Sequence, residues 1–152
     1  MKTIDQICEA LELIMKVPRS DNYVQEFEHA LSESIDFSNP EIIGVLINFL
    51  DDAEDYPELM YSIIHSVEVF EDKVYIGELL KTAAKLCTRS PKWASIVFMR
   101  VLNSDSCKRE LIRQVRLCDA DTKSAIKRLM EDINQVDTSF LEKTVPVLAS
   151  VS

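Results

Sequence analysis

Apolar residues recur at helical spacing along the whole chain. Thr3 and Gln6 have the spacing of a capping box that begins the first helix, and Pro18 ends it. The apolar positions of this helix repeat at i, i+3, i+7 and i+10, as Ile4, Ile7, Leu11 and Ile14. Ser20 or Asp21 begins a second helix, with the predicted buried stripe Val24, Phe27, Leu31 and Ile35. The chain therefore opens with two amphipathic helices.

The central part of the chain predicts four more helices. The third, Glu41–Leu50, is apolar on nearly every side and should lie centrally. Asp55 and Glu58 have the spacing of another capping box, at the start of the fourth. A fifth helix runs from near 72 to 87, and Ser90-Pro91 begins the sixth with a serine cap and a proline in the first turn.

Three further helices complete the pattern. They are expected at roughly 105–117 and 121–136 and from 137–139 onward, the last weakened by Pro146. Helices of this length joined by short links imply antiparallel neighbours. We therefore predict an all-α fold of eight or nine antiparallel helices, packed pairwise in a compact, HEAT-like bundle.

The predicted domain organisation is one helical domain over residues 1–152. A chain of 152 residues has the size of an ordinary domain, and no stretch rich in Pro, Gly or Ser divides it. Gly44 and Gly77 are the only glycines, and both lie within helical patterns. This shortage disfavours the glycine-dependent Rossmann, P-loop and all-β folds.

The cysteines and the hydropathy pattern indicate a cytoplasmic protein. The four cysteines have no C-x-x-C spacing and are expected to be free thiols: Cys8, Cys87, Cys107 and Cys118. The start of the chain has no secretory-signal pattern, and no apolar run reaches the roughly 20 residues of a membrane span. With two histidines in the chain, neither a metal site nor a cofactor is expected.

Charge divides the chain in two. Residues 1–78 carry 18 Asp and Glu against 4 Lys and Arg, a net of −14, whereas residues 79–152 carry 8 against 13, a net of +5. The acid concentrates in the segment 50–72, LDDAEDYPELMYSIIHSVEVFED. Such a surface attracts a cationic partner and repels nucleic acid, so it predicts a protein that binds another protein.

The acidic segment also carries aromatic side chains, which suits tight binding of a basic protein. The alternative is that the acids at Asp55 and Glu58 only complement a helix N-terminus and that the others are solvated. If the segment binds a partner, the predicted contact residues are Asp51, Asp52, Glu54, Asp55, Glu58, Tyr61, His65, Glu68 and Asp72.

Catalytic and metal-binding alternatives have weaker support. His65 and Glu68 lie one helical turn apart, but a catalytic zinc needs a third ligand, and the only other histidine is His29. A carboxylate-based Mg²⁺ hydrolase acting on nucleotides would need Glu9 and Glu12 to converge with the acids at 68–72. No catalytic residue is therefore assigned.

The remaining candidates have simpler interpretations. Arginines at helical spacing, followed by two lysines, form a basic face at Arg109, Arg113, Arg116, Lys123 and Lys127. No aromatic residue interleaves with them, so a solvated face is favoured over nucleic-acid binding. Trp93 is expected to pack in the core, with a role as an interface anchor as the alternative.

Two segments together resemble the Immunity protein 30 (Imm30) type of immunity protein, found in bacterial polymorphic-toxin and contact-dependent growth inhibition systems. They are LDD-x3-YPELMYSIIHSVEVFED and SPKWASIVFMRVLNS, within about residues 40–105. The matching positions are Asp51, Asp52, Tyr56, Glu58, Tyr61, His65, Glu68, Ser90, Pro91, Trp93, Arg100 and Asn103.

The resemblance implies a cytoplasmic antidote that is not an enzyme. It would bind the C-terminal domain of a cognate toxin, as a monomer in a 1:1 complex, and block its active site or substrate-binding surface. The implied toxin is a basic nuclease, with an RNase preferred over a DNase. Structural roles are implied for Trp93, Arg100 and Asn103, with Arg100 pairing either Asp51 or Asp52. A HEAT-like adaptor with an unrelated partner is the alternative.

Overall fold

The computed structural model describes residues 2–16 and 22–152. Within these residues the chain forms nine α-helices and one short 3-10 helix, without a β-strand, which confirms the predicted all-α fold. The helices are α1 (Ile4–Lys16), α2 (Tyr23–Ser34), α3 (Glu41–Ile47), α4 (Pro57–Glu68), α5 (Asp72–Arg89), α6 (Pro91–Leu102), α7 (Asp105–Val115), α8 (Ala120–Val136) and α9 (Leu141–Ser150), with the 3-10 helix η1 (Thr138–Phe140) before α9.

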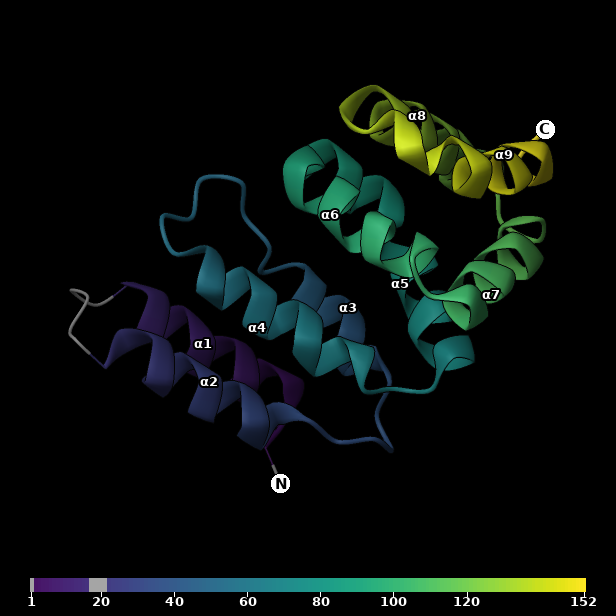
Figure 1. Ribbon diagram of the computed structural model, residues 1–152. Coiled ribbons are helices and arrows are strands. Elements are labelled where there is room, and N and C mark those ends of the chain that lie inside the picture. The colour runs from purple at the N-terminus through teal and green to yellow at the C-terminus, as the bar shows by residue number, and fades with distance from the viewer. Residues whose placement is uncertain (1, 17–21) are drawn as a thin grey trace.

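The helices are stacked in layers along the molecule (Figure 1). α1 and α2 form one end of the stack, and α8 and α9 form the other end, with α3 to α7 between them. Helices that follow one another pack together, as α1 with α2, α3 with α4, α5 with α6 and α8 with α9. α5 joins the two halves, because it packs against α3 on one side and against α7 and α8 on the other. This arrangement agrees with the predicted pairwise packing.

The buried apolar side chains form one continuous cluster from Ile7 on α1 to Val147 on α9. α3 lies centrally, as its sequence predicts, and its side chains Ile42, Ile43, Leu46 and Ile47 are buried. Burial of this apolar surface is the main stabilising contribution to a helical stack. No helix among residues 2–16 and 22–152 has the length and apolarity needed to cross a membrane.

Several helix ends agree with the sequence pattern. The capping box at the start of α1 is present, because the Thr3 N–H donates to Gln6 Oε1 at 2.9 Å and the Gln6 N–H donates to Thr3 Oγ1 at 3.2 Å. The predicted end at Pro18 and the predicted start at Ser20 or Asp21 lie outside the described residues.

Two predicted ends are wrong. α4 has Tyr56 at its N-cap without a side-chain hydrogen bond there, so Asp55 and Glu58 form no capping box. α3 ends at Ile47 and not at Leu50. Beyond Ile47 the Leu50 N–H donates to the Ile47 carbonyl in a tighter turn, and the chain leaves the helix toward the α3–α4 loop.

Candidate partner-binding surface

The loop between α3 and α4 is held against the junction of α5 and α6. The Leu50 carbonyl oxygen accepts hydrogen bonds from the Ser90 hydroxyl at 2.7 Å and from the Arg89 guanidinium at 3.3 Å. The Asp51 carboxylate accepts from the Ala53 N–H at 2.9 Å, in a turn typical of aspartate. These bonds fix the loop backbone, so its acidic side chains extend from a defined position.

Asp52 caps the first turn of α6. Its Oδ2 accepts from the Lys92 N–H at 3.0 Å, and its Oδ1 accepts from the Trp93 N–H at 3.1 Å. The first N–H groups of a helix have no partner within that helix, so a carboxylate supplies the partner together with a favourable charge. Ser90, the predicted cap, uses its hydroxyl on the α3–α4 loop instead. Asp52, a predicted partner contact, thus has its contacts within the chain.

The side chains of α4 divide between the core and the surface. One arc is completely buried and consists of Leu59, Met60, Ile63, Ile64 and Val67. The opposite arc exposes Glu58, Tyr61 and His65, as the helical period predicts. The Tyr61 ring is 39% exposed, stands edge-on to Trp93 with centroids 5.1 Å apart, and lies 6.4 Å from the His65 ring. Packing on Trp93 therefore orders an exposed aromatic ring on α4.

Glu68, the last residue of α4, binds Arg100 on α6 through two hydrogen bonds. Arg100 Nε donates to Glu68 Oε2 and Arg100 Nη2 donates to Glu68 Oε1, both at 2.8 Å. The predicted pairing of Arg100 with Asp51 or Asp52 is wrong, because Glu68 occupies the guanidinium and Asp52 caps α6. The hydrogen bonds that Arg100 donates to Glu68 raise the pKa of Arg100. This bidentate pair ties α4 to α6 beside Tyr61.

Asp72 and Glu54 are half-buried. Asp72 is the first residue of α5, and its Oδ1 accepts a hydrogen bond from Cys107 Sγ at 3.2 Å. Burial raises the pKa of the Cys107 thiol, so this thiol is protonated at neutral pH and donates. Asp72 therefore lies in a recess and not on the open surface.

The other five predicted contact residues are exposed on the α3–α4 loop and on α4. We call this surface the acidic ridge, and it consists of Asp51, Asp55, Glu58, Tyr61 and His65. Glu28 on α2 lies beside it, because the Ser62 hydroxyl donates to Glu28 Oε1 at 3.0 Å. On the α6 side, Lys92 Nζ lies 5.5 Å from the centroid of the Trp93 ring. Glu28 was not predicted, since the contact joins residues 34 positions apart and no local spacing signals it.

Trp93 and Asn103 have different environments. Trp93 is 2% exposed and belongs to the hydrophobic cluster, where it supports the Tyr61 ring. Asn103 is exposed at the C-terminal end of α6, and its side-chain oxygen accepts a hydrogen bond from Lys143 of α9. Asn103 thus links α6 to the last helix.

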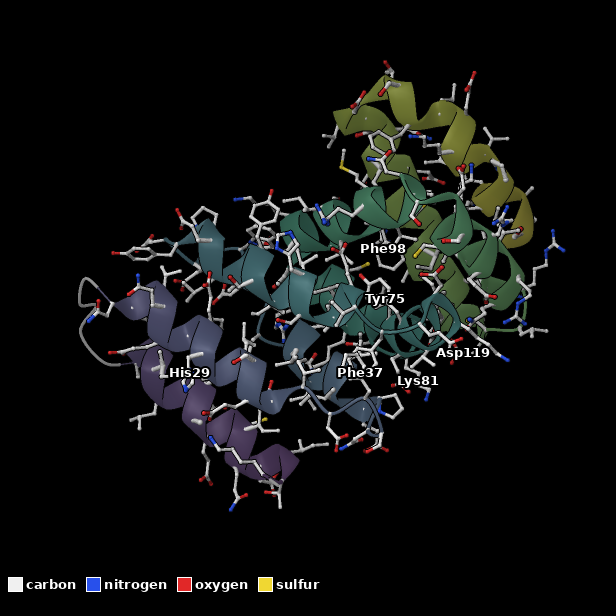
Figure 2. The ribbon with its side chains drawn as sticks, turned by 60° about the horizontal axis from the view of Figure 1, so that its bottom comes forward. His29, Phe37, Tyr75, Lys81, Phe98 and Asp119 are labelled. Carbon is white, nitrogen blue, oxygen red and sulfur yellow. The ribbon has the colours of Figure 1, made fainter. Side chains whose placement is uncertain are left out.

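The described residues do not assemble the alternative sites. No three His, Cys, Asp or Glu side chains in the described part of the chain are grouped so that they could hold a metal ion. His29 lies on α2 and contacts Glu33 at 2.9 Å, in a different part of the molecule from Tyr75 (Figure 2). On the basic face, Arg113 pairs with Glu110 at 2.8 Å, as a solvated helical face commonly does. The carboxylate convergence that a Mg²⁺ hydrolase needs is thus not found in these residues.

Fold and surface together define an all-α protein that presents ordered acidic and aromatic side chains to solvent. The family model of Immunity protein 30 matches residues 14–111, which include α4, α5, α6 and the acidic ridge. The chain therefore belongs to the Immunity protein 30 family. Membership of an immunity family implies a cognate toxin as the partner, and such families are generally not enzymes. Comparisons with curated proteins and with solved structures gave no match.

Proposed function

We propose that this protein binds the C-terminal domain of its cognate toxin through the acidic ridge and blocks the toxin's active site or substrate-binding surface. The observation that carries the proposal is the exposure of Asp51, Asp55 and Glu58 next to Tyr61 on a rigid support. Carboxylates around an exposed ring pair with Lys and Arg of a partner and bury apolar area at the same time.

The proposed partner is a basic nuclease, preferably an RNase, of a polymorphic-toxin or contact-dependent growth inhibition system. Nucleases that bind a polyanion present a cationic surface, and the net charge of −14 over residues 1–78 complements it. The complex is a 1:1 assembly in the cytoplasm, where four free cysteines are stable. Inhibition follows from occlusion, and the chain catalyses no reaction of its own.

The predicted contact residues have different roles in this proposal. The acidic ridge makes the direct contacts, together with Glu28 at its edge. Asp52 and Glu68 do not contact the toxin directly in this proposal. They hold α6 and α4 in place beneath the ridge. A charge reversal at Asp52 or Glu68 would disturb the fold before it reports on binding.

The test uses the C-terminal domain encoded by the gene immediately upstream, with affinity measured by calorimetry. The variant Asp55→Lys/Glu58→Lys reverses two ridge charges, and we expect it to bind at least about 100-fold more weakly, with an unchanged circular dichroism spectrum. The matched control, Glu131→Lys/Glu142→Lys, reverses two exposed acids on α8 and α9 and should bind about as tightly as the wild type.

Two outcomes would contradict the proposal. If the wild type and the ridge variant bind the toxin domain with equal affinity, the acidic ridge does not take part in binding. Absence of binding by the wild type would remove the toxin-binding function for that partner. An upstream gene that encodes no toxin domain would favour the HEAT-like adaptor, which the stacked helix pairs also suit.

A further inference from the structure

A cleft lies between the end of α4, the start of α5 and the junction of α6 and α7. Its volume is about 380 Å³, and its lining includes Glu68, Asp72, Tyr75, Arg100, Asn103 and Cys107. Glu68 is three residues after His65, about one helical turn along α4, so the cleft continues the acidic ridge at its far end. All six side chains lie within the residues matched by the family model.

The Tyr75 hydroxyl in this cleft lacks a hydrogen-bond partner among the described residues. Tyr75 is 2% exposed and lies in the middle of the molecule (Figure 2). A buried hydroxyl without a partner is costly, and native proteins rarely keep one without a reason. Burial also raises the pKa of Tyr75, so the phenol is neutral and able both to donate and to accept.

The charges in the cleft select the ligand. Glu68 and Arg100 neutralise each other through their bidentate pair, which leaves the carboxylate of Asp72 as the excess charge. The hydrogen bond that Asp72 receives comes from a thiol, which is a weak donor. An anionic ligand would be repelled by the uncompensated carboxylate of Asp72, and an apolar ligand would leave the phenol unpaired. A cation with several N–H donors satisfies both Asp72 and Tyr75.

We infer that the cleft receives one basic side chain, lysine or arginine, from the toxin domain. Its charged group lies between the Asp72 carboxylate and the Tyr75 hydroxyl, and both of them accept its hydrogen bonds. This inference rests on the proposed function, since it specifies a second contact of the same interface. The acidic ridge would attract the toxin surface, and the cleft would fix the position of the toxin domain on this protein by burying one of its charged side chains.

The test compares Tyr75→Phe and Asp72→Asn with wild type for binding of the upstream-encoded toxin domain. Tyr75→Phe should weaken binding about 3- to 10-fold, the effect of one lost hydrogen bond, while the urea midpoint of the free protein stays equal or rises. A purely structural hydroxyl would instead lower that midpoint. Asp72→Asn should weaken binding about 10- to 100-fold, because it removes the charge that the ligand neutralises.

Asp105→Asn is the matched control. Asp105 is the first residue of α7, just as Asp72 is the first residue of α5. Unlike Asp72, Asp105 is exposed and does not line the cleft. It should bind within about twofold of wild type. Equal weakening by Asp105→Asn and Asp72→Asn would show a general charge effect and overturn the inference. If both cleft variants bind like wild type while the ridge reversal does not, the cleft inference is wrong and the proposed function stands. If wild type itself does not bind, the proposed function has failed as well.

Discussion

Neighbouring carboxylates in the segment 50–72 differ in what they contact. Asp52 and Glu68 each accept two hydrogen bonds from α6, whereas Asp55 and Glu58 are exposed. A carboxylate with two fixed donors already has its partners, so its removal costs stability. An exposed carboxylate is free to pair with a partner protein, so its removal costs binding.

The Glu68–Arg100 pair should contribute measurably to stability. Its two charge-assisted hydrogen bonds favour the folded state, but the side chains are 27% and 38% exposed, so solvent screens part of the attraction. In a double-mutant cycle of Glu68→Gln and Arg100→Gln, urea unfolding should give a coupling of about 1 kcal/mol. The control is Glu78–Lys81, where the lysine is 73% exposed and the coupling should stay below about 0.5 kcal/mol. Equal coupling in the two pairs would contradict the assigned role.

At the level of elements, α6 begins with a cap supplied from outside its own sequence. Asp52→Ala removes the acceptor for the Lys92 and Trp93 N–H groups and should lower the free energy of unfolding by about 1–2 kcal/mol. Asp52→Asn keeps an acceptor oxygen and should cost less. Urea unfolding measures both, with the exposed Asp55→Ala as a control that should leave stability unchanged. Equal stability of the Asp52→Ala and Asp55→Ala variants would show that the cap is dispensable.

The cap of α8 predicts a pH dependence. Asp119 is the N-cap, and its pKa is lowered because the Thr122 N–H donates to its carboxylate at 2.8 Å. The folded pKa lies below the unfolded one, so the stabilisation is complete above about pH 4 and is lost as the pH falls through the folded pKa. Asp119→Ala should therefore be less stable than wild type at neutral pH, and the difference should close in acid. Asp121→Ala changes an acid in the same first turn but keeps the cap. Its difference in stability from wild type should therefore not shrink as the pH falls in the way expected for Asp119→Ala.

Element boundaries were more predictable than the partners of individual side chains. The capping box of Thr3 and Gln6 could be predicted because its residues are three positions apart. The cap of α6 could not, since Asp52 lies 40 positions before Lys92 and reaches it only after the α3–α4 loop has packed. The same holds for Arg100, whose partner Glu68 is 32 positions away. The exposure of Glu58, Tyr61 and His65 agrees with the helical period of α4, whereas the cleft depends on the packing of α4 to α7.

On the scale of the whole molecule, one hydrophobic cluster connects the first helix to the last. We therefore expect the predicted single domain to unfold in one cooperative transition, because the hydrophobic core continues without a break between the two halves of the stack. Trp93 fluorescence reports on the centre of the molecule and far-UV circular dichroism on all helices, so their urea midpoints should coincide. An earlier transition seen by circular dichroism alone would show that part of the stack unfolds independently.

The uneven charge of the whole molecule should control how fast it finds its toxin. Residues 1–78 carry a net charge of −14, and the acidic ridge exposes part of it on α4 and the loop before it. Salt screens attraction between separated charges more than contacts already formed, so the association rate should fall at least about tenfold between roughly 0.05 and 0.5 M NaCl. The dissociation rate should change far less. Stopped-flow mixing with the upstream-encoded toxin domain measures the association rate, and Asp55→Lys/Glu58→Lys should flatten its salt dependence. An association rate independent of salt would mean that the ridge does not face the toxin during encounter, whatever contacts the final complex contains.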